Sequence, residues 1–457
     1  MQSPREAPPL PPLKIRNVTV RGNKRTSPAL FEHELQKAYD ATTFVEVSES
    51  LNIAAQELRS FGIFDSIDIL MDKAQGGSRY ETDVIITVKE SRMMSLYAGV
   101  ESEGVEGAAN SKCTLTNPLG NAEQIELGLS HGQYGSDSQN FSYRRPKFLG
   151  FPAWLTANAV NEVQVFERFS SYREKFRGGT VSVSDYNGVH DLAFNLGWRD
   201  IVPVRNKKIP NTYAASPGIM AEAVPSTKSS IKYTYNDDQR NNSTLPTTGR
   251  LLRASAEVAG LWGDVQFVKA EAEVQHNVPI GPIAYNNPIL NLMLSSRFGA
   301  VRSYGADRER PARISDRFFL GGPLSLRGFN HKGVGPRANP DDGGVATGDA
   351  LGGEVFYSVG ASLGFPFPLP LLALFGVRGH VFANAGSLSG WDRVLDENNW
   401  MKNLIEDSRA AVGVGLVVGT QFGRLEANYS WVLKSLNGVR ASISLSLVAI
   451  SSWATTL

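Results

Sequence analysis

The chain has a single cysteine, Cys113, among 457 residues. One cysteine excludes internal disulfides, CxxC redox motifs and cysteine-rich zinc sites. A catalytic thiol would need a base beside it, and the neighbours Lys112 and Thr114 supply none. A structural role for Cys113 is therefore expected.

Motifs of common enzyme classes are also scarce. HExxH does not occur, the 6 histidines are scattered, and Gly321-Gly322-Pro323 lacks the Lys-Ser/Thr end of a phosphate-binding loop. Asp341, Asp342 and Asp349 do not have the spacing of EF-hand calcium ligands, and a solvated acidic turn explains them better. The sequence therefore predicts no enzyme, no cofactor and no metal site.

Long apolar runs are missing too. None reaches the roughly 18 residues that a membrane helix needs, and the mean hydropathy is −0.20. This excludes helical membrane spans, but not a membrane barrel, whose strands hide their hydrophobicity in alternation. The formal net charge of +1 predicts no affinity for nucleic acids. Residues 1–12 are Pro-rich, fit neither a secretory signal nor a transit peptide, and are expected to be a disordered lead-in.

Residues 13–91 have a compact, mixed pattern. A strand ends at Arg21-Gly22-Asn23, Pro28 suits the first turn of a helix, and Gly62 is placed to end a second helix. Two further strands are expected at 63–71 and 83–90. The order β-α-α-β-β predicts a small α+β domain with one open sheet, whose edges can accept another strand.

Residues 92–457 consist of short strands with one apolar and one polar face. Alternation alone fits either a soluble sandwich or a membrane barrel. About 365 residues without a domain break, strands of about ten residues, and a total of about sixteen strands favour the barrel. Aromatic residues near strand ends, as in an interfacial girdle, favour it as well: Tyr97, Phe151, Trp154, Trp198, Tyr429 and Trp431.

A Gly- and Pro-rich connection at about 302–350 separates two of these strands and contains Arg327-Gly328-Phe329. Loops of this length usually carry function or are disordered. On local sequence alone, the triplet fits an exposed turn with a solvated arginine.

The strands after this loop suggest a second interpretation. Alternation places Glu354, Phe382 and Asn384 on the lumen face. Glu354 is then predicted to bind the Arg327 guanidinium in a bidentate manner, with Phe329 packed beside Phe382. In the alternative, Glu354 lines water and Arg378 neutralises it.

Taken in order, these motifs resemble the outer-membrane barrel-assembly superfamily, which contains the bacterial BamA proteins and a mitochondrial sorting and assembly branch. The matching residues are Arg327-Gly328-Phe329, Gly353-Glu354 and Phe382-Ala383-Asn384-Ala385-Gly386. The N-terminal segment resembles a POTRA domain at 21–23 and 58–64. Asn384 departs from the Asp usual in bacterial members, which leaves Glu354 as the clear anionic partner. One POTRA-like domain without a secretory signal is similar to the mitochondrial branch, and a chloroplast-envelope or bacterial relative is the alternative.

The resemblance implies a sixteen-stranded transmembrane antiparallel β-barrel, at 92–457, in the mitochondrial outer membrane, with its POTRA-like domain in the intermembrane space. It implies an insertase for β-barrel precursors, with the lipid bilayer, peripheral cytosol-facing subunits and intermembrane-space chaperones as partners. The runner-up is a passive or secretory polypeptide-translocating pore of the same superfamily. A soluble β-rich enzyme or lectin comes third.

The expected lateral gate joins the first strand, about 94–101, to the last, 439–448. A precursor strand in hydrocarbon leaves backbone groups unsatisfied at several kcal/mol each, so insertion needs a template edge. Gly99 and the serines of the last strand would weaken pairing across this seam. The residues expected to pair with client strands are Ser95, Leu96, Tyr97, Ala98, Gly99, Val100, Ala441, Ile443 and Leu445.

Overall fold

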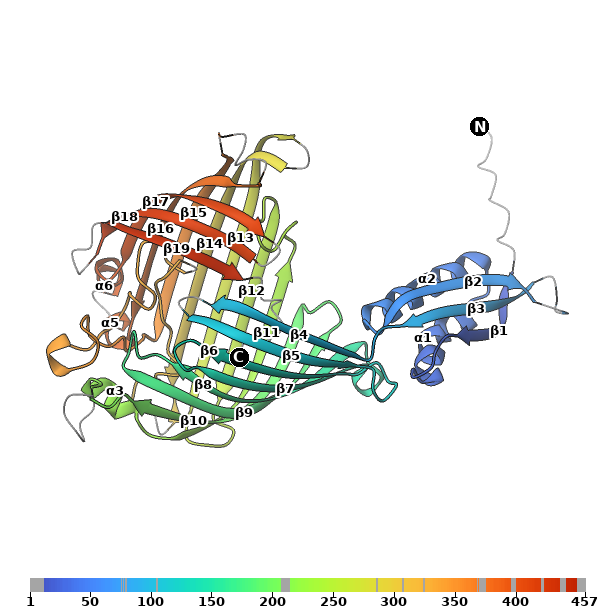
Figure 1. The fold of residues 1–457 in the computed structure, drawn as a ribbon, viewed down its shortest axis with the longest axis horizontal. Helices are drawn as coiled ribbons and strands as arrows, with labels where there is room; N and C mark the ends of the chain where they lie inside the picture. The colour runs from blue at the N-terminus through green and yellow to red at the C-terminus, as the bar shows by residue number, and fades with distance from the viewer. Residues whose placement is uncertain are drawn as a thin grey trace. The chain divides into compact units, whose positions relative to one another are not determined.

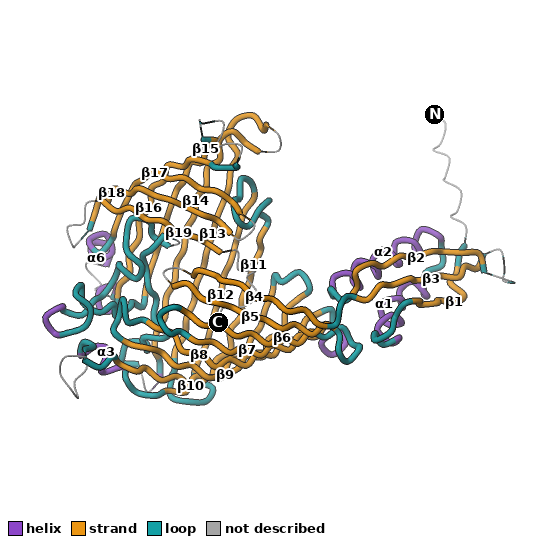
Figure 2. Tube along the Cα trace, in the orientation of Figure 1, coloured by secondary structure: helices purple, strands orange, loops and turns teal. Residues whose placement is uncertain are grey.

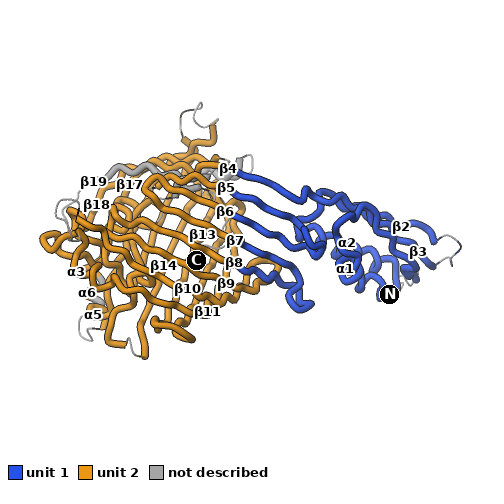
Figure 3. The backbone as a smooth tube through the Cα atoms, turned by 60° about the horizontal axis from the view of Figure 1, so that its bottom comes forward, with its two compact units in different colours: residues 1–97, 112–128, 141–158 blue, residues 98–111, 129–140, 159–457 orange. Residues whose placement is uncertain are grey.

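The computed structural model describes residues 12–74, 76, 78, 80–103, 106–206, 214–284, 287–305, 308–323, 325–367, 369, 375–395, 400–420, 423–435 and 441–449. The expected disordered lead-in lies outside this range, apart from Pro12. The chain divides into two compact units, shown in Figure 3. The first comprises 1–97, 112–128 and 141–158, and the second comprises 98–111, 129–140 and 159–457.

The N-terminal domain has the predicted order of elements. These are β1 (Lys14–Arg21), α1 (Pro28–Asp40), α2 (Phe44–Ser60), β2 (Phe64–Lys73) and β3 (Glu81–Glu90). The sheet order is β1-β3-β2, in which β3 runs parallel to β1 and antiparallel to β2. β1 and β2 are therefore the two edges of an open sheet, as expected (Figure 1).

Local sequence explains where the helix α2 begins and which face it buries. Thr43 and Glu46 form a capping box, in which each side chain binds the other residue's backbone amide. The buried residues then recur at helical spacing, so that one stripe of α2 faces the core. They are Val47, Leu51, Ala54, Ala55 and Leu58. Gly62 follows with a φ of +69°, which a residue without a Cβ adopts at low cost.

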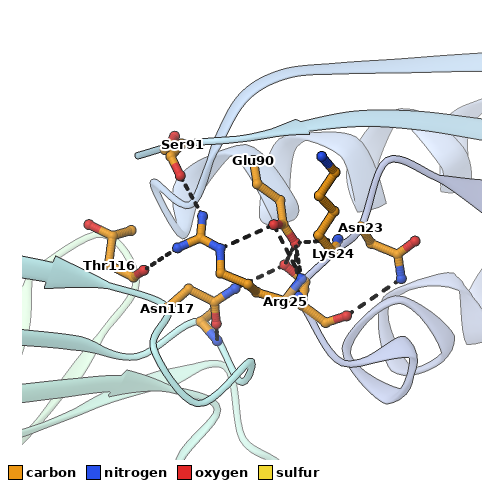
Figure 4. Close-up of polar contacts among 9 residues, drawn as sticks. Asn23, Lys24, Arg25, Glu90, Ser91, Thr116 and Asn117 are labelled. Atoms are coloured by element: carbon orange, nitrogen blue, oxygen red, sulfur yellow. Dashed lines mark hydrogen bonds and ion pairs between the residues drawn. The ribbon is translucent and has the colours of Figure 1, made fainter. Parts of the chain in front are cut away.

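The carboxylate of Glu90 organises the turn after β1 (Figure 4). It accepts hydrogen bonds from the backbone amides of Lys24 (3.1 Å), Arg25 (3.0 Å) and Thr26 (2.8 Å), and from the Thr26 hydroxyl (2.7 Å). The Arg25 Nε lies 3.2 Å from the same carboxylate, and the Glu90 side chain is only 7% exposed. The end of β3 and the turn after β1 are thus tied through one side chain.

The same network extends into the rest of the first unit (Figure 4). The Arg25 guanidinium also donates to the carbonyls of Ser91 (2.5 Å) and Thr116 (3.3 Å). Asn117 donates from its amide to the Thr26 hydroxyl over 2.9 Å. Arg25 therefore joins the N-terminal domain to Ser91, which lies just before the first strand of the large sheet, and to Thr116, which ends the second strand.

The strands from β4 to β19 form one 16-stranded sheet, in which they follow their order in the sequence. Figure 2 shows that strands make up most of the chain. The strands are β4 (Met94–Glu103), β5 (Glu106–Thr116), β6 (Gln124–Gly132), β7 (Asp137–Pro146), β8 (Ala153–Val165), β9 (Tyr172–Asp185), β10 (His190–Pro203), β11 (Ser226–Asp238), β12 (Gly249–Ala259), β13 (Phe267–Ala284), β14 (Asn287–Ser303), β15 (Val355–Pro366), β16 (Arg378–Ser389), β17 (Arg409–Thr420), β18 (Gly423–Lys434) and β19 (Ala441–Ala449).

Short helices lie between some of these strands. They are α3 (Pro217–Glu222), α5 (Trp391–Val394) and α6 (Trp400–Glu406). Over the residues that the structure covers, no helix combines the length and the apolar character needed to cross a membrane.

Exposure of the apolar face decides between the sandwich and the barrel. Within the second unit the sheet curls into a barrel (Figure 1). Leu192 on β10 is 53% exposed, whereas its neighbour Ala193 is 7% exposed. In a sandwich the large apolar side chains would be buried between two sheets, but here they lie on the outer surface. Further outward-facing examples are Leu196, Trp198, Val268, Val274, Val359, Leu363, Val381, Val414, Tyr429 and Trp431. The predicted barrel is therefore confirmed, with most of its large exposed apolar side chains on the outer face.

Trp154 is an exception among the aromatic residues expected at the surface. It is only 4% exposed. Its ring packs edge-on against Phe61 of the N-terminal domain, with 6.1 Å between centroids, and Arg144 lies 4.0 Å from the ring centroid. The prediction of an interfacial role for Trp154 is wrong, because strand alternation does not show which residues meet the neighbouring domain.

The Glu90 network predicts an acid-sensitive contribution to stability. Burial raises the pKa of Glu90, but hydrogen bonds from Thr26 and Arg25 outweigh burial and lower the pKa to about 2. Because this is below the ordinary value of 4.5, the stabilisation is complete above pH 4.5 and is lost as the pH falls towards 2. Glu90→Gln should therefore destabilise the N-terminal domain at pH 7 by about 1–3 kcal/mol.

The measurement is hydrogen exchange of peptides covering residues 20–30 in the full chain, compared at each pH between Glu90→Gln and the unaltered protein. The difference in exchange rate between the two proteins should shrink between pH 5 and pH 2. Asp65→Asn is the matched control, because Asp65 forms an exposed pair with Lys89 at 3.4 Å. Equal effects of the two substitutions would contradict the central role of Glu90.

Candidate functional site

The loop between β14 and β15 lies inside the barrel. It leaves β14 after Ser303 and joins β15 at Val355. Its apolar side chains form a buried cluster with inward-facing side chains of several strands, so that part of the lumen is packed like a protein core. The cluster consists of Ala259, Val265, Phe267, Val301, Ala312, Phe318, Leu320, Leu326, Val334, Phe356 and Leu388, with Phe329 packed against it.

Arg327 is held by β16 and β18. Its Nε lies 2.5 Å from Glu426 Oε1, and its Nη2 lies 3.4 Å from Oε2 of the same carboxylate. Asn384 donates from its amide to the Arg327 carbonyl over 3.2 Å. The guanidinium lies 5.3 Å from the centroid of the Phe382 ring. Glu426 is 2% exposed, so Arg327 is a paired cation within the wall of the lumen and not a solvated turn residue.

The predicted pairing of Arg327 with Glu354 is wrong. Glu354 accepts hydrogen bonds from the backbone amides of Ala312 (3.0 Å) and Trp391 (3.3 Å). Its own amide binds the carbonyl of Ser389, at the end of β16. Arg327 lies beside Asn384, five residues earlier on β16, and five residues of strand span roughly 16 Å. Alternation places both residues on the lumen face but leaves their heights along the barrel undetermined.

The other predicted members of this group have mixed outcomes. Asn384 and Phe382 contact Arg327, whereas the prediction paired Arg327 with Glu354 and Phe382 with Phe329. Phe329 packs against the buried cluster of the loop, whereas Phe382 lies against the guanidinium. Arg378, the alternative partner of Glu354, donates to Asn291 Oδ1 over 3.2 Å.

Gly328 allows the loop to approach the wall. Its φ is +91°, and a Cβ at this position would lie 2.8 Å from the Ala411 Cβ and 3.2 Å from the Ser430 Cβ. Any larger residue would therefore push the tip away from β17 and β18, in addition to the backbone strain. We call residues 327–329 the tip of the loop.

Glu426 could have been found from the sequence of β18. Arg424, Glu426, Asn428 and Ser430 alternate there with Leu425, Ala427, Tyr429 and Trp431. This pattern places a carboxylate on the lumen face, where a loop cation can reach it. The resemblance drew attention to β15 and β16, and β18 lies far from both in the sequence.

The opposite side of the loop is held by carboxylates of its own. Asp349 is fully buried and accepts from the Ser171 hydroxyl (2.7 Å) and the Ser216 amide (2.9 Å). Its assignment to a solvated acidic turn is therefore wrong, because its backbone returns into the lumen. Asp316 pairs with Arg199 at 2.8 Å and Lys228 at 3.3 Å.

Two further kinds of site, a serine hydrolase nucleophile and a metal centre, have little support among the described residues. Two pentapeptides, 128–132 and 360–364, have the GxSxG spacing of serine hydrolases. Both lie within strands, whereas a nucleophile elbow needs a turn from strand to helix. Over the described residues, no group of three or more His, Cys, Asp or Glu side chains is arranged to hold a metal ion.

The predicted gate strands are the two ends of the sheet. Within the described residues, β4 and β19 each have one neighbour in the sheet order. On β4, Leu96 is 73% exposed and Val100 is 81% exposed. Ser95, Tyr97, Ala98 and Gly99 share this strand, while Ala441, Ile443 and Leu445 are placed on β19 by their backbone, since the structure does not describe their side chains.

Comparisons with known proteins agree with this architecture. Residues 117–448 match the Omp85 superfamily domain. The chain is 30% identical over 426 residues to the sorting and assembly machinery component 50 homolog of Bos taurus, covering 91% of this chain and 85% of that protein. It is 28% identical over 433 residues to a SAM50-like protein of Schizosaccharomyces pombe, covering 92% and 86%.

The fold has a solved counterpart. The crystal structure of BamA from Haemophilus ducreyi lacking POTRA domains 1–3 superimposes with a TM-score of 0.75 at 19% identity, covering 95% of this chain and 83% of that one. The family match spans most of the large sheet and includes the lumen loop, its tip and Glu426. This chain belongs to the Omp85 superfamily.

Proposed function

We propose that this protein folds and inserts β-barrel precursors into the mitochondrial outer membrane, through a lateral gate between β4 and β19. A relative named as a sorting and assembly machinery component supports an assembly role. The class of client and the location are those implied by the resemblance described above. The observation that carries the mechanism is that β4 and β19 are the two ends of the described sheet. Backbone donors and acceptors at such ends can pair with a client strand.

The gate provides a physical route into the bilayer without chemical catalysis. Each client strand would pair with a template edge before it meets lipid, so its backbone groups would stay hydrogen-bonded throughout insertion. The exposed apolar side chains Leu96 and Val100 suit an edge that faces lipid. Gly99 in the same strand reduces side-chain pairing and so lowers the cost of opening.

The N-terminal domain is proposed to be a POTRA domain in the intermembrane space. Its element order and its free edges β1 and β2 support this assignment. An incoming precursor, or a chaperone that delivers it, could add a strand to either edge. Peripheral subunits on the cytosolic side would complete the assembly complex.

The loop tip is proposed to stabilise the barrel beside the gate. Arg327 binds Glu426 on β18, which is the neighbour of the end strand β19. The tip thus fixes the wall next to the seam without contacting clients. The packed cluster in the lumen also counts against the alternative of a pore that moves unfolded polypeptide through the barrel.

Client crosslinking tests the gate. In a Cys113→Ser background, cysteines placed at Ser95, Tyr97 or Gly99 should form disulfides with cysteines in the last strand of an arrested precursor, because β4 is the proposed template. Leu196→Cys on the outer face of β10 is the control, since it is 47% exposed but distant from both ends of the sheet order. Equal crosslinking at Leu196 and β4 would overturn the lateral gate.

Removal of the tip cation tests the stabilising role. Arg327→Ala should lower the temperature at which the barrel loses its heat-modifiable electrophoretic mobility, because it removes one of the two cations of the buried Glu426. The cost should be smaller than the ~3–5 kcal/mol of an unpaired buried charge, since Arg424 stays paired with Glu426. Arg173→Ala is the control and should change little, since Arg173 pairs with Glu167 on the exposed surface. Equal heat resistance of Arg327→Ala and the unaltered protein would show that the loop depends on other anchors.

A further inference from the structure

The loop is attached to one side of the barrel by buried backbone and hydroxyl hydrogen bonds. The Ala350 amide binds the Phe169 carbonyl over 2.9 Å, and the Ser170 hydroxyl binds the Ala350 carbonyl over 2.8 Å. Beside them, the fully buried Asp349 accepts from Ser171 and Ser216. Withdrawal of the loop here would leave several buried donors without acceptors, which is costly.

A second set of contacts holds the same side. Asp316 is 2% exposed and lies between Arg199 of β10 and Lys228 of β11. Lys228 also pairs with Glu257 at 2.6 Å, so Arg199 is the wall cation that depends more on Asp316. The next residue, Arg317, binds Glu222 of α3 at 2.7 Å. The buried Asp316 carboxylate is thus held by cations from two strands. Its neighbour Arg317 is a cation that binds a carboxylate of the helix α3. This side of the loop, from 312 to 317 and from 345 to 351, is the anchored side.

At the tip, the only wall carboxylate that Arg327 binds among the described residues already has a second cation. Arg424 lies 2.7 Å from Glu426 on the same strand. Asn428 also donates to Glu426 over 2.8 Å. If Arg327 left, Glu426 would keep a paired charge and a hydrogen bond. The usual penalty for an isolated buried carboxylate would therefore be reduced.

We propose that the lumen loop is a fixed part of the β9–β11 side of the barrel, that only its tip releases from β16–β18, and that Arg424 is the counter-ion that keeps Glu426 paired after release. β10 and β18 are 7th and 15th in the order of the 16 strands, so the loop links opposite sides of the barrel. Release would free the wall beside β19 while the opposite wall keeps its support.

The role of this release in gating rests on the proposed insertase function, but the release itself can be measured separately. Two single cysteines in a Cys113→Ser background report on the two sides. Ser430→Cys lies under the tip and Ser170→Cys lies under the anchored side, and both serines are fully buried. Ser170→Cys weakens the anchoring hydrogen bond to the Ala350 carbonyl, so this substitution can only favour faster labelling at 170 and works against the expected result. The Ser430 hydroxyl makes no hydrogen bond within the described structure, so sulfur should replace it with little loss.

The experiment measures labelling by a small water-soluble maleimide in the membrane-embedded full chain. We expect Ser430→Cys to react at least about tenfold faster than Ser170→Cys, because labelling of a buried thiol requires local opening. Arg327→Ala should raise the rate at 430 and leave the rate at 170 unchanged. Equal rates at the two positions, or a rise at both with Arg327→Ala, would overturn the proposal.

Substitution of Arg424 gives a second test, in which loss of an ion pair is expected to slow labelling at 430. Without a replacement counter-ion, release of the tip would leave Glu426 without a cation, so Arg424→Gln should slow labelling at 430. Arg424→Lys keeps the charge and should restore the rate. If Arg424 served only to stabilise this wall, Arg424→Gln would speed labelling instead, and that result would overturn its assigned role.

Client insertion is assayed in parallel with the unaltered chain and with each variant. If the unaltered chain inserts no precursor while the labelling pattern holds, the insertase proposal fails and the tip release stands. If insertion proceeds but labelling at 430 and 170 is equal, the loop proposal alone fails. Heat-modifiable mobility confirms that each variant retains a folded barrel before its rates are compared.

Discussion

Pairing of backbone amides and carbonyls is the constraint on which this fold depends. Large apolar side chains face outward along the strands, so the surroundings they suit contain no water to satisfy a free strand edge. A sheet of 16 strands in sequence order satisfies each internal strand from two sides. Backbone groups with a neighbouring strand on one side only are therefore concentrated at β4 and β19. The proposed function uses these strands as the template for a client.

The inner face of the barrel needs a different kind of stabilisation, because many of the side chains that line it are polar. The loop between β14 and β15 supplies an apolar cluster for packing and charges for the walls. Its own carboxylates, Asp316 and Asp349, face β9–β11 and α3, while its cation Arg327 faces β18. Charged side chains at separate positions thus let a single segment bind two different walls. The unequal number of contacts then indicates which end can move.

In the N-terminal domain, too, one buried charged side chain binds several parts of the chain. Glu90 satisfies three consecutive backbone amides at a turn that has no regular partner strand. Arg25 neutralises it and reaches Ser91 and Thr116, so the chain leaving β3 is held next to the start of the large sheet. A carboxylate used in this way gives a stable junction that weakens only in strong acid.

The sequence by itself determined the β-α-α-β-β order, the strand alternation and the inward-facing sides of β15 and β16, because these follow from local periodicity and turn chemistry. Through the resemblance, it also grouped Arg327, Gly328 and Phe329 with Glu354, Phe382 and Asn384, although Glu354 lies elsewhere along the wall. Tertiary structure alone decided that the apolar faces lie outside, that Asp349 is buried, and that Arg327 binds Glu426 and not Glu354. Alternation assigns a face to each residue, but the height at which a long loop meets the wall depends on packing among strands far apart in the chain.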